Sequence, residues 1–199
     1  MRKPTDLSSR GTESANTLSL PAVEFSRIRF RRSILSEHPT RRPMLWIDAD
    51  ACPVAIKELV FRTALRLQIE TTLVANQSIS IPKSDLIQRI TVPGGADVAD
   101  NLIVDRMAAG DVVITADIPL AARVVEKGGI AIGTRGELFD DATVHGRLAT
   151  RNLMEQFRAA GMETSGPKPQ NKKNLQTFAN QLDRTLTKIL SRWEKRQNQ

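Results

Sequence analysis

Short apolar runs alternate with longer segments of helical period along most of this chain, and this alternation restricts the possible folds more than any other feature. The apolar or β-branched runs predict strands at 44–48, 69–75, 86–92, 111–115 and 130–132. Apolar residues at helical spacing predict helices at 54–68, 97–109, 119–127, 144–160 and 175–196. Strands that alternate with helices form a parallel sheet with helices on both faces. The sequence therefore predicts an α/β fold in three α/β/α layers, with a central, mostly parallel sheet and C-terminal helices.

Carboxylates stand at the places where predicted strands end or a helix begins. Asp48 and Asp50 end the first apolar run, and Asp117 follows the run at 112–115. Asp97 and Asp100 open the helix that follows a Pro-Gly-Gly break. Open α/β sheets bind ligands at the carboxyl edge of their strands, so these acidic groups are expected to converge there.

Neighbouring carboxylates repel one another and need a divalent cation, a shared proton or a basic partner. Mg²⁺ and Mn²⁺ prefer oxygen ligands, keep several waters and commonly bind together with a substrate phosphate. Such a site activates water for phosphodiester cleavage. We therefore expect Mg²⁺ or Mn²⁺ at Asp48, Asp50, Asp97, Asp100 and Asp117. The alternative for Asp50, Asp97 and Asp100 is a structural one, in which they stabilise helix N-termini.

Several basic residues are candidates for orienting a substrate anion beside such a centre. They are Arg123, Arg135, Lys168, Lys172 and Lys173. The alternative for each is a solvated surface charge.

The composition excludes several classes of site. Aromatic residues make up 4% of the 199 residues and tyrosine is absent, which disfavours a large base-stacking platform. Cys52 is the only cysteine, so neither an intrachain disulfide nor a multi-cysteine zinc site forms. Its expected role is that of a small buried residue rather than a reactive thiol. A single cysteine and the lack of an apolar run of about 20 residues predict a cytoplasmic protein outside the membrane.

The charge is unevenly distributed. Residues 1–43 hold nine basic and four acidic residues, 44–160 hold twelve and fifteen, and 161–199 hold eight and three. An acidic middle between basic ends is typical of a cation-binding centre flanked by surfaces that attract polyanions. A solvated basic surface is the alternative.

Residues 1–43 show no persistent period and predict a disordered basic extension. Its Arg-rich, acid-poor composition also allows an organelle transit peptide, and Met44 also allows a start at that residue. A single ordered domain is predicted over 44–199, with a stiff polar loop at 161–169.

Five motifs, in order, resemble those of the YaiI/YqxD family of uncharacterised bacterial proteins. They are Ile47–Pro53, Val74–Asn76, Asp97–Asp100, Ile114–Ala121 and Gly166–Pro169. The resemblance covers residues 44 to about 190 and implies a PIN-like fold related to the NYN ribonucleases. Those nucleases carry acidic residues at the end of the first strand, at the start of a middle helix and after a Thr- or Ser-x-Asp strand end. Asp48, Asp97 and Asp117 match these places and are the catalytic residues that the resemblance implies.

The resemblance implies a metal-dependent nuclease with nucleic acid, expected to be RNA, as its substrate. Asn76 belongs to one of the matching motifs and is expected to contact the substrate. Gln77 stands where similar proteins commonly have histidine.

Two other functions remain open. An apolar strand followed by Asp-x-Asp also occurs in phosphatases of the haloacid dehalogenase class, with Asp48 as nucleophile and Asp50 as general acid. Two features count against this interpretation. Position 52 is Cys rather than Thr or Val, and no acidic pair follows a late strand. The second alternative is a non-catalytic nucleic-acid-binding or interaction module on the same fold, which binds the phosphate backbone through its basic tail. The sequence leaves the oligomeric state open.

Overall fold

A computed structural model describes residues 41–162 and 171–198. They contain one six-stranded sheet of order β3-β2-β1-β4-β5-β6. The strands are β1 (Leu45–Asp48), β2 (Thr71–Ala75), β3 (Ile87–Thr91), β4 (Val112–Ile114), β5 (Ile130–Ile132) and β6 (Leu138–Phe139). Every neighbouring pair is parallel except β5 with β6. The predicted mostly parallel sheet is confirmed. The two-residue β6 was not predicted, because it is too short to show a period.

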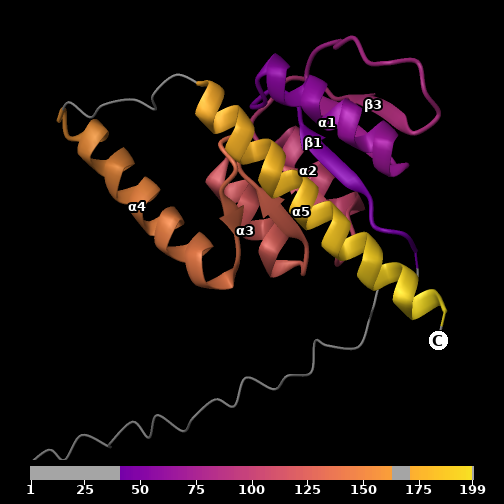
Figure 1. Cartoon of the computed structure of the whole chain (residues 1–199). Coiled ribbons are helices and arrows are strands. Elements are labelled where there is room, and N and C mark those ends of the chain that lie inside the picture. The colour runs from indigo at the N-terminus through magenta and orange to yellow at the C-terminus, as the bar shows by residue number, and fades with distance from the viewer. Residues whose placement is uncertain (1–40, 163–170, 199) are drawn as a thin grey trace, which may run out of the picture. The chain divides into compact units, whose positions relative to one another are not determined.

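Helices cover both faces of the sheet, which confirms the predicted three layers (Figure 1). The helices are α1 (Val54–Leu67), α2 (Val98–Arg106), α3 (Ile118–Glu126), α4 (Asp141–Ala159) and α5 (Lys172–Gln197). One core cluster joins α1 and α5 to one face, and a second joins α2, α3 and the start of α4 to the other. No helix within the described ranges has the length and hydropathy that a bilayer span requires.

The topology places a switch in strand order beside β1. The chain runs outward from β1 through β2 to β3, and then crosses back through α2 to β4 on the other side of β1. The connections that leave β1 and β4 therefore diverge above the carboxyl ends of these two strands. This divergence is the topological switch point at which open α/β sheets bind their ligands.

A buried carboxylate joins β1 to β4 at the other end of the two strands. Asp111 is fully buried and directly precedes β4. It accepts hydrogen bonds from the backbone N–H of Met44 at 2.9 Å and from Trp46 Nε1 at 3.0 Å. It also accepts the N–H of Ala108 at 2.9 Å and pairs with Arg41 at 2.5 Å. A buried charge is stable only when donors surround it, and here four donors do so.

The ordered structure includes residues that were expected to belong to the disordered extension. Arg41 binds Asp111, Pro43 is buried, and Arg42 donates to the carbonyl oxygens of Gln68 at 2.5 Å and Leu67 at 3.2 Å. The described residues therefore begin three positions before the predicted boundary at residue 44. Hydrogen bonds from arginines leave no apolar period, so the sequence pattern did not reveal them. Residues 1–40 and the connection at 163–170, with Lys168, lie outside the described residues.

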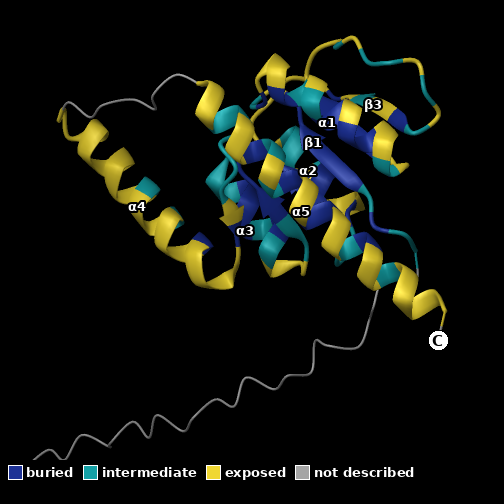
Figure 2. Ribbon diagram, viewed as in Figure 1, coloured by how far each residue is buried: buried dark blue, intermediate teal, exposed yellow. Residues whose placement is uncertain are grey.

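Helix α5 buries the apolar stripe that its sequence predicts. Phe178, Leu182 and Leu186 are fully buried against the α1 side of the sheet. By contrast, α4 has Val144 as its only buried residue, and Figure 2 shows most of its length exposed. Its first turns are held by a capping box between Asp140 and Thr143 and by Arg147, whose guanidinium lies 5.3 Å from the ring centre of Phe139.

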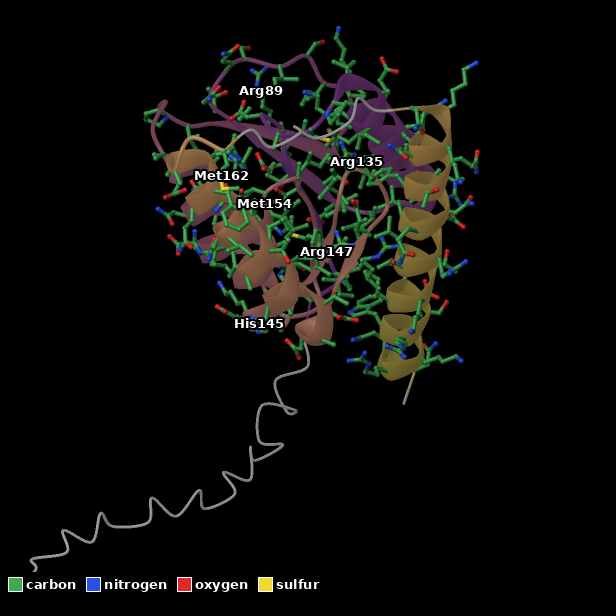
Figure 3. The ribbon with its side chains drawn as sticks, turned by 90° about the vertical axis from the view of Figure 1, so that its left-hand side faces the viewer. Arg89, Arg135, His145, Arg147, Met154 and Met162 are labelled. Carbon is green, nitrogen blue, oxygen red and sulfur yellow. The ribbon has the colours of Figure 1, made fainter. Side chains whose placement is uncertain are left out.

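The apolar residues in the second half of α4 and just beyond it are exposed. They are Leu153, Met154, Phe157 and Met162. Figure 3 shows Met154 and Met162 on this part of the chain, well beyond Arg147.

Gly136 fixes the start of α5 against the β5–β6 turn. Its φ of +87° lies in the left-handed region, and a Cβ there would meet the backbone N of Phe178 and the backbone C of Thr177 at 2.7 Å. Backbone atoms move less readily than side-chain ends. A side chain at position 136 would therefore displace the first turns of α5.

We expect Gly136→Ala to lower the free energy of unfolding by about 2 kcal/mol or more, through the left-handed φ and the close contact together. Gly146→Ala in α4 is the matched control, because a Cβ at position 146 has no atom within 4 Å. That control should stabilise the protein by up to about 1 kcal/mol, from helix propensity. Urea unfolding of the two variants measures both effects, and equal stabilities would contradict the packing described for α5.

Candidate functional site

Asp48 is the most buried carboxylate at the carboxyl edge of the sheet. It is the last residue of β1 and its relative exposure is 4%. Burial is the largest cause that raises the pKa of Asp48, and the negative charges of Asp50 and Asp117 raise this pKa further. Hydrogen bonds from the Thr115 hydroxyl and the Ala51 backbone act in the opposite direction. The negative form of Asp48 therefore lies in an unfavourable, electronegative environment.

Thr115 joins the ends of β1 and β4. Its Oγ1 donates to Asp48 Oδ2 at 2.7 Å and accepts the backbone N–H of Asp117 at 2.9 Å. Asp117 in turn caps α3, because its Oδ2 accepts the N–H of Leu120 at 3.0 Å. One buried hydroxyl thus connects the carboxylate of Asp48, at the end of β1, with the backbone of Asp117, just beyond β4. The Thr-x-Asp spacing was the signal for this arrangement, although the sequence analysis assigned no role to Thr115.

Asp100 is the third carboxylate of the cluster. It is half-buried on the first turn of α2. Its pKa is raised to about 6, first by burial and then by the charges of Asp48, Asp117 and Asp97, while Arg123 lowers it. The acidic residues predicted from three separate segments therefore do interact across the switch point.

Asp97 and Asp100 differ in burial and in the charges that surround them. Asp97 was assigned to the catalytic set, yet it is exposed, whereas Asp100 interacts with Asp48 and Asp117. Asp97 is the N-cap of α2, but its side chain makes no capping hydrogen bond. Its backbone has φ 59° and ψ 8°, a left-handed conformation that residues other than glycine seldom adopt. Such strain is often found at functional sites.

Asp50 lies beside the cluster and joins two loops. It is exposed, and its Oδ2 accepts the backbone N–H of Asn76 at 2.8 Å, which connects the end of β1 with the end of β2. It does not cap α1, whose N-cap is Pro53. Asn76 thus belongs to the edge of the site, through its backbone.

The described residues fit a hydrated cation better than a fully liganded one. Among residues 41–162 and 171–198, no three His, Cys, Asp or Glu side chains are close enough to hold an ion between them. Mg²⁺ requires fewer protein ligands, since it commonly keeps several waters and binds through one or two carboxylates plus substrate phosphate. The mutual repulsion around Asp48 and Asp100 is the electrostatic condition that such a cation would relieve.

Two basic residues lie near this group of carboxylates, one beside Asp100 and one beside the end of β1. Arg123 on α3 is half-buried, donates to Asn101 Oδ1 at 2.8 Å and lowers the pKa of Asp100. Lys57 on α1 was not predicted, and its Nζ donates to the carbonyl oxygen of Ala49 at 3.1 Å, directly after Asp48. No sequence motif marks Lys57, because only the folded helix brings it back to the strand end.

The other predicted basic residues are farther along the chain. Arg135 is half-buried in the turn between β5 and β6, where Figure 3 labels it, and its N–H donates to Glu137 Oε2 at 3.1 Å. Lys172 and Lys173 are exposed on the first turn of α5. Their contact with a substrate stays a prediction, as does that of Lys168.

Cys52 is buried, as expected. Burial is the main cause that raises the pKa of its thiol to about 12; Asp48 adds to this effect and Lys57 opposes it. A thiol with this pKa is protonated at neutral pH and is a poor nucleophile.

Asp100→Asn should change stability in a pH-dependent way. The folded-state pKa of about 6 is above the ordinary value of 3.8, so the folded state binds the proton more tightly. The corresponding stabilisation is complete below about pH 4 and is lost as the pH rises to about 6. We expect the variant to melt several degrees above wild type at pH 7.5 and at nearly the same temperature at pH 4. Asp105→Asn, on the exposed side of α2, is the control and should show no such difference.

The strain at Asp97 can be separated from its charge. Asp97→Gly removes the Cβ that disfavours a left-handed φ and should stabilise the protein by up to about 1 kcal/mol, whereas Asp97→Ala should destabilise it. Asp97→Asn removes the charge but keeps a residue that tolerates this conformation. Chemical unfolding of the three variants measures the order, and an Ala variant at least as stable as the Gly variant would rule out the strain.

Comparisons with known proteins agree with the resemblance seen in the motifs. The model of the uncharacterised bacterial YaiI/YqxD family matches residues 46–188. Relatives named UPF0178 protein, from Shewanella piezotolerans and Dechloromonas aromatica, are each 53% identical over 145 residues, which is 73% of this chain and 95% and 97% of theirs. One from Pectobacterium atrosepticum is 51% identical over 145 residues, 73% of this chain and 97% of its own. No solved structure matches the chain. The chain therefore belongs to the YaiI/YqxD family.

Proposed function

We propose that this protein is a divalent-metal-dependent nuclease that hydrolyses phosphodiester bonds in nucleic acid, with RNA as the expected substrate. The observation that carries the proposal is the interaction of Asp48, Asp100 and Asp117 at the switch point of the sheet. These carboxylates come from three separate segments. The fold therefore places negative charges close together, although the repulsion between these carboxylates lowers the stability of the protein. Such an unfavourable cluster of charges is typical of a functional site.

Each residue of the site has a distinct task in this proposal. One or two of the carboxylates of Asp48, Asp100 and Asp117 would hold a hydrated Mg²⁺ or Mn²⁺ ion, and the remaining ligands would be waters and the substrate phosphate. The bound ion supplies a Lewis acid and a water of lowered pKa. Thr115 keeps the Asp48 carboxylate in one orientation through its 2.7 Å hydrogen bond. Arg123 and Lys57 are the cations next to the carboxylates, and they would hold the substrate phosphate by charge-assisted hydrogen bonds.

The distribution of charge favours a polyanionic substrate. Basic residues lie on α3, on α1 and at the start of α5, where Lys172 and Lys173 are exposed. Few aromatic residues are available for stacking, so we expect the phosphate backbone to contribute more to binding than the bases. Cleavage with little sequence preference follows from this mode of binding.

The proposal is tested with labelled single-stranded RNA, DNA of the same sequence and p-nitrophenyl phosphate, each with Mg²⁺ or Mn²⁺. Wild type should cleave RNA only when metal is added. Asp48→Asn and Asp117→Asn should lower the rate by about 100-fold or more. Asp105→Asn, also a loss of one carboxylate but on an exposed part of α2, should keep the wild-type rate.

Other outcomes would favour the alternatives. Hydrolysis of p-nitrophenyl phosphate without RNA cleavage would indicate a phosphatase that uses Asp48 and Asp50. RNA binding without hydrolysis of any substrate would indicate a non-catalytic module. Metal binding is measured separately, because an ion that binds only the folded state raises the melting temperature of wild type and leaves that of Asp48→Asn unchanged.

A further inference from the structure

A second cavity lies at the opposite edge of the sheet from the carboxylates. Its volume is about 450 Å³, and it opens where the start of β5, the edge strand β6 and the end of α3 meet the side of α5. The parallel strands begin at this edge, whereas Asp48 is the last residue of β1 and Asp117 lies beyond the end of β4. The proposed nuclease site and this cavity therefore have no residue in common.

The floor of the cavity is apolar. It is formed by Ile130 of β5, Leu138 and Phe139 of β6 and Ile189 of α5. β6 has only two residues and ends the sheet, so it leaves the floor open, and Leu138 is 41% exposed. Small-molecule sites in proteins typically have volumes of about 300–1,000 Å³ and are lined mainly by apolar side chains.

One wall of the cavity carries a row of cations. Arg184, Lys188 and Arg192 stand one helical turn apart on α5, about 6 Å from each to the next along the helix axis. Within residues 41–162 and 171–198, their side chains have no ion pair or hydrogen bond. The acidic residue beside this row, Asp183, instead pairs at 2.5 Å with Arg66 of α1, on the other flank of α5. The flank that faces the cavity therefore keeps a net positive charge.

Two acidic residues, Asp140 and Asp141, also line the cavity and offset part of the charge of this row, so the lining keeps a net charge of +1. Asp140 is occupied as the N-cap of α4, where it accepts hydrogen bonds from the N–H of Thr143 at 2.9 Å and from its Oγ1 at 2.7 Å. Asp141 lies in the first turn of the same helix, where negative charge is favourable. Both carboxylates thus stabilise the start of α4 and keep their charge, whereas the three cations form no ion pair or side-chain hydrogen bond with the described residues.

We propose that this cavity is a binding site for a small organic polyanion. Its apolar, preferably planar body would lie on Ile130, Leu138 and Ile189, and its phosphate or carboxylate groups would reach Arg184, Lys188 and Arg192. An inorganic anion would leave the apolar floor exposed to water, and an uncharged apolar ligand would leave the cations unused. A ligand that combines both properties complements the whole cavity.

Isothermal titration calorimetry in metal-free buffer tests the proposal on the full-length protein. The probes are ATP and benzene-1,3,5-tricarboxylate, which combine charge with a planar body, and inorganic triphosphate and adenosine, which have one property each. We expect one or both of the first two to bind saturably at one site. The other two should bind at least about tenfold more weakly. Binding of ATP would indicate a nucleotide ligand, and binding of the tricarboxylate would indicate a polycarboxylate.

Matched variants locate the binding. Neutralising Arg184, Lys188 and Arg192 together, each to Gln, should weaken binding by about tenfold or more. Neutralising Arg62, Lys83 and Lys195, each to Gln, removes the same charge from exposed positions outside the cavity and should leave binding unchanged. Melting temperatures show whether both variants are folded.

Three results would overturn the proposal. They are no saturable binding of either planar anion, equal losses in the two triple variants, and a cavity variant that loses affinity for single-stranded RNA while no small anion binds. The last result would show that the row of cations contacts nucleic acid instead. None of these results depends on nuclease activity, so the two proposals can fail separately.

Discussion

A buried carboxylate at each end of the β1–β4 pair holds these two strands together, and the rest of the structure depends on this pairing. At the amino end, Asp111 is surrounded by four donors from the β1 side, from the end of α2 and from Arg41. At the carboxyl end, Asp48 of β1 accepts the hydroxyl of Thr115, which follows β4. The two strands are far apart in the sequence, and their adjacency creates the switch point at which α2 and α3 converge.

The two carboxylates differ in how completely the protein satisfies them, and this difference indicates their roles. Asp111 has a donor for each of its main acceptor positions, so it is a structural group with little capacity left for a ligand. Asp48 has fewer donors and has Asp50, Asp117 and Asp100 as negative neighbours. A buried charge in this second environment is stabilised when a cation arrives. Residues of the same type thus serve the fold at one edge of the sheet and the proposed chemistry at the other.

The sequence predicted the strands and helices that show an apolar period, and the residues at which such a period ends. It missed the features that depend on single contacts. Alternation of apolar runs with helical segments identified five of the six strands and all five helices, and strand ends identified Asp48 and Asp117. The sequence revealed neither the half-buried position of Asp100 nor the left-handed backbone of Asp97, because neither feature leaves a period. Lys57 and Arg41 were missed for a related reason: each acts through one hydrogen-bonded contact with a segment distant in sequence or on another element.

The burial of Cys52 has a practical consequence for work on this protein in solution. Because burial raises the pKa of the thiol to about 12, Cys52 is protonated at neutral pH and supplies almost no thiolate. Maleimide and iodoacetamide reagents attack the thiolate, so the native chain should be almost inert to both. A cysteine introduced at an exposed position, such as Ser78 in the β2–β3 loop, would then be labelled alone. Fluorophores and spin labels can thus be attached to this protein without first removing its own cysteine from the core.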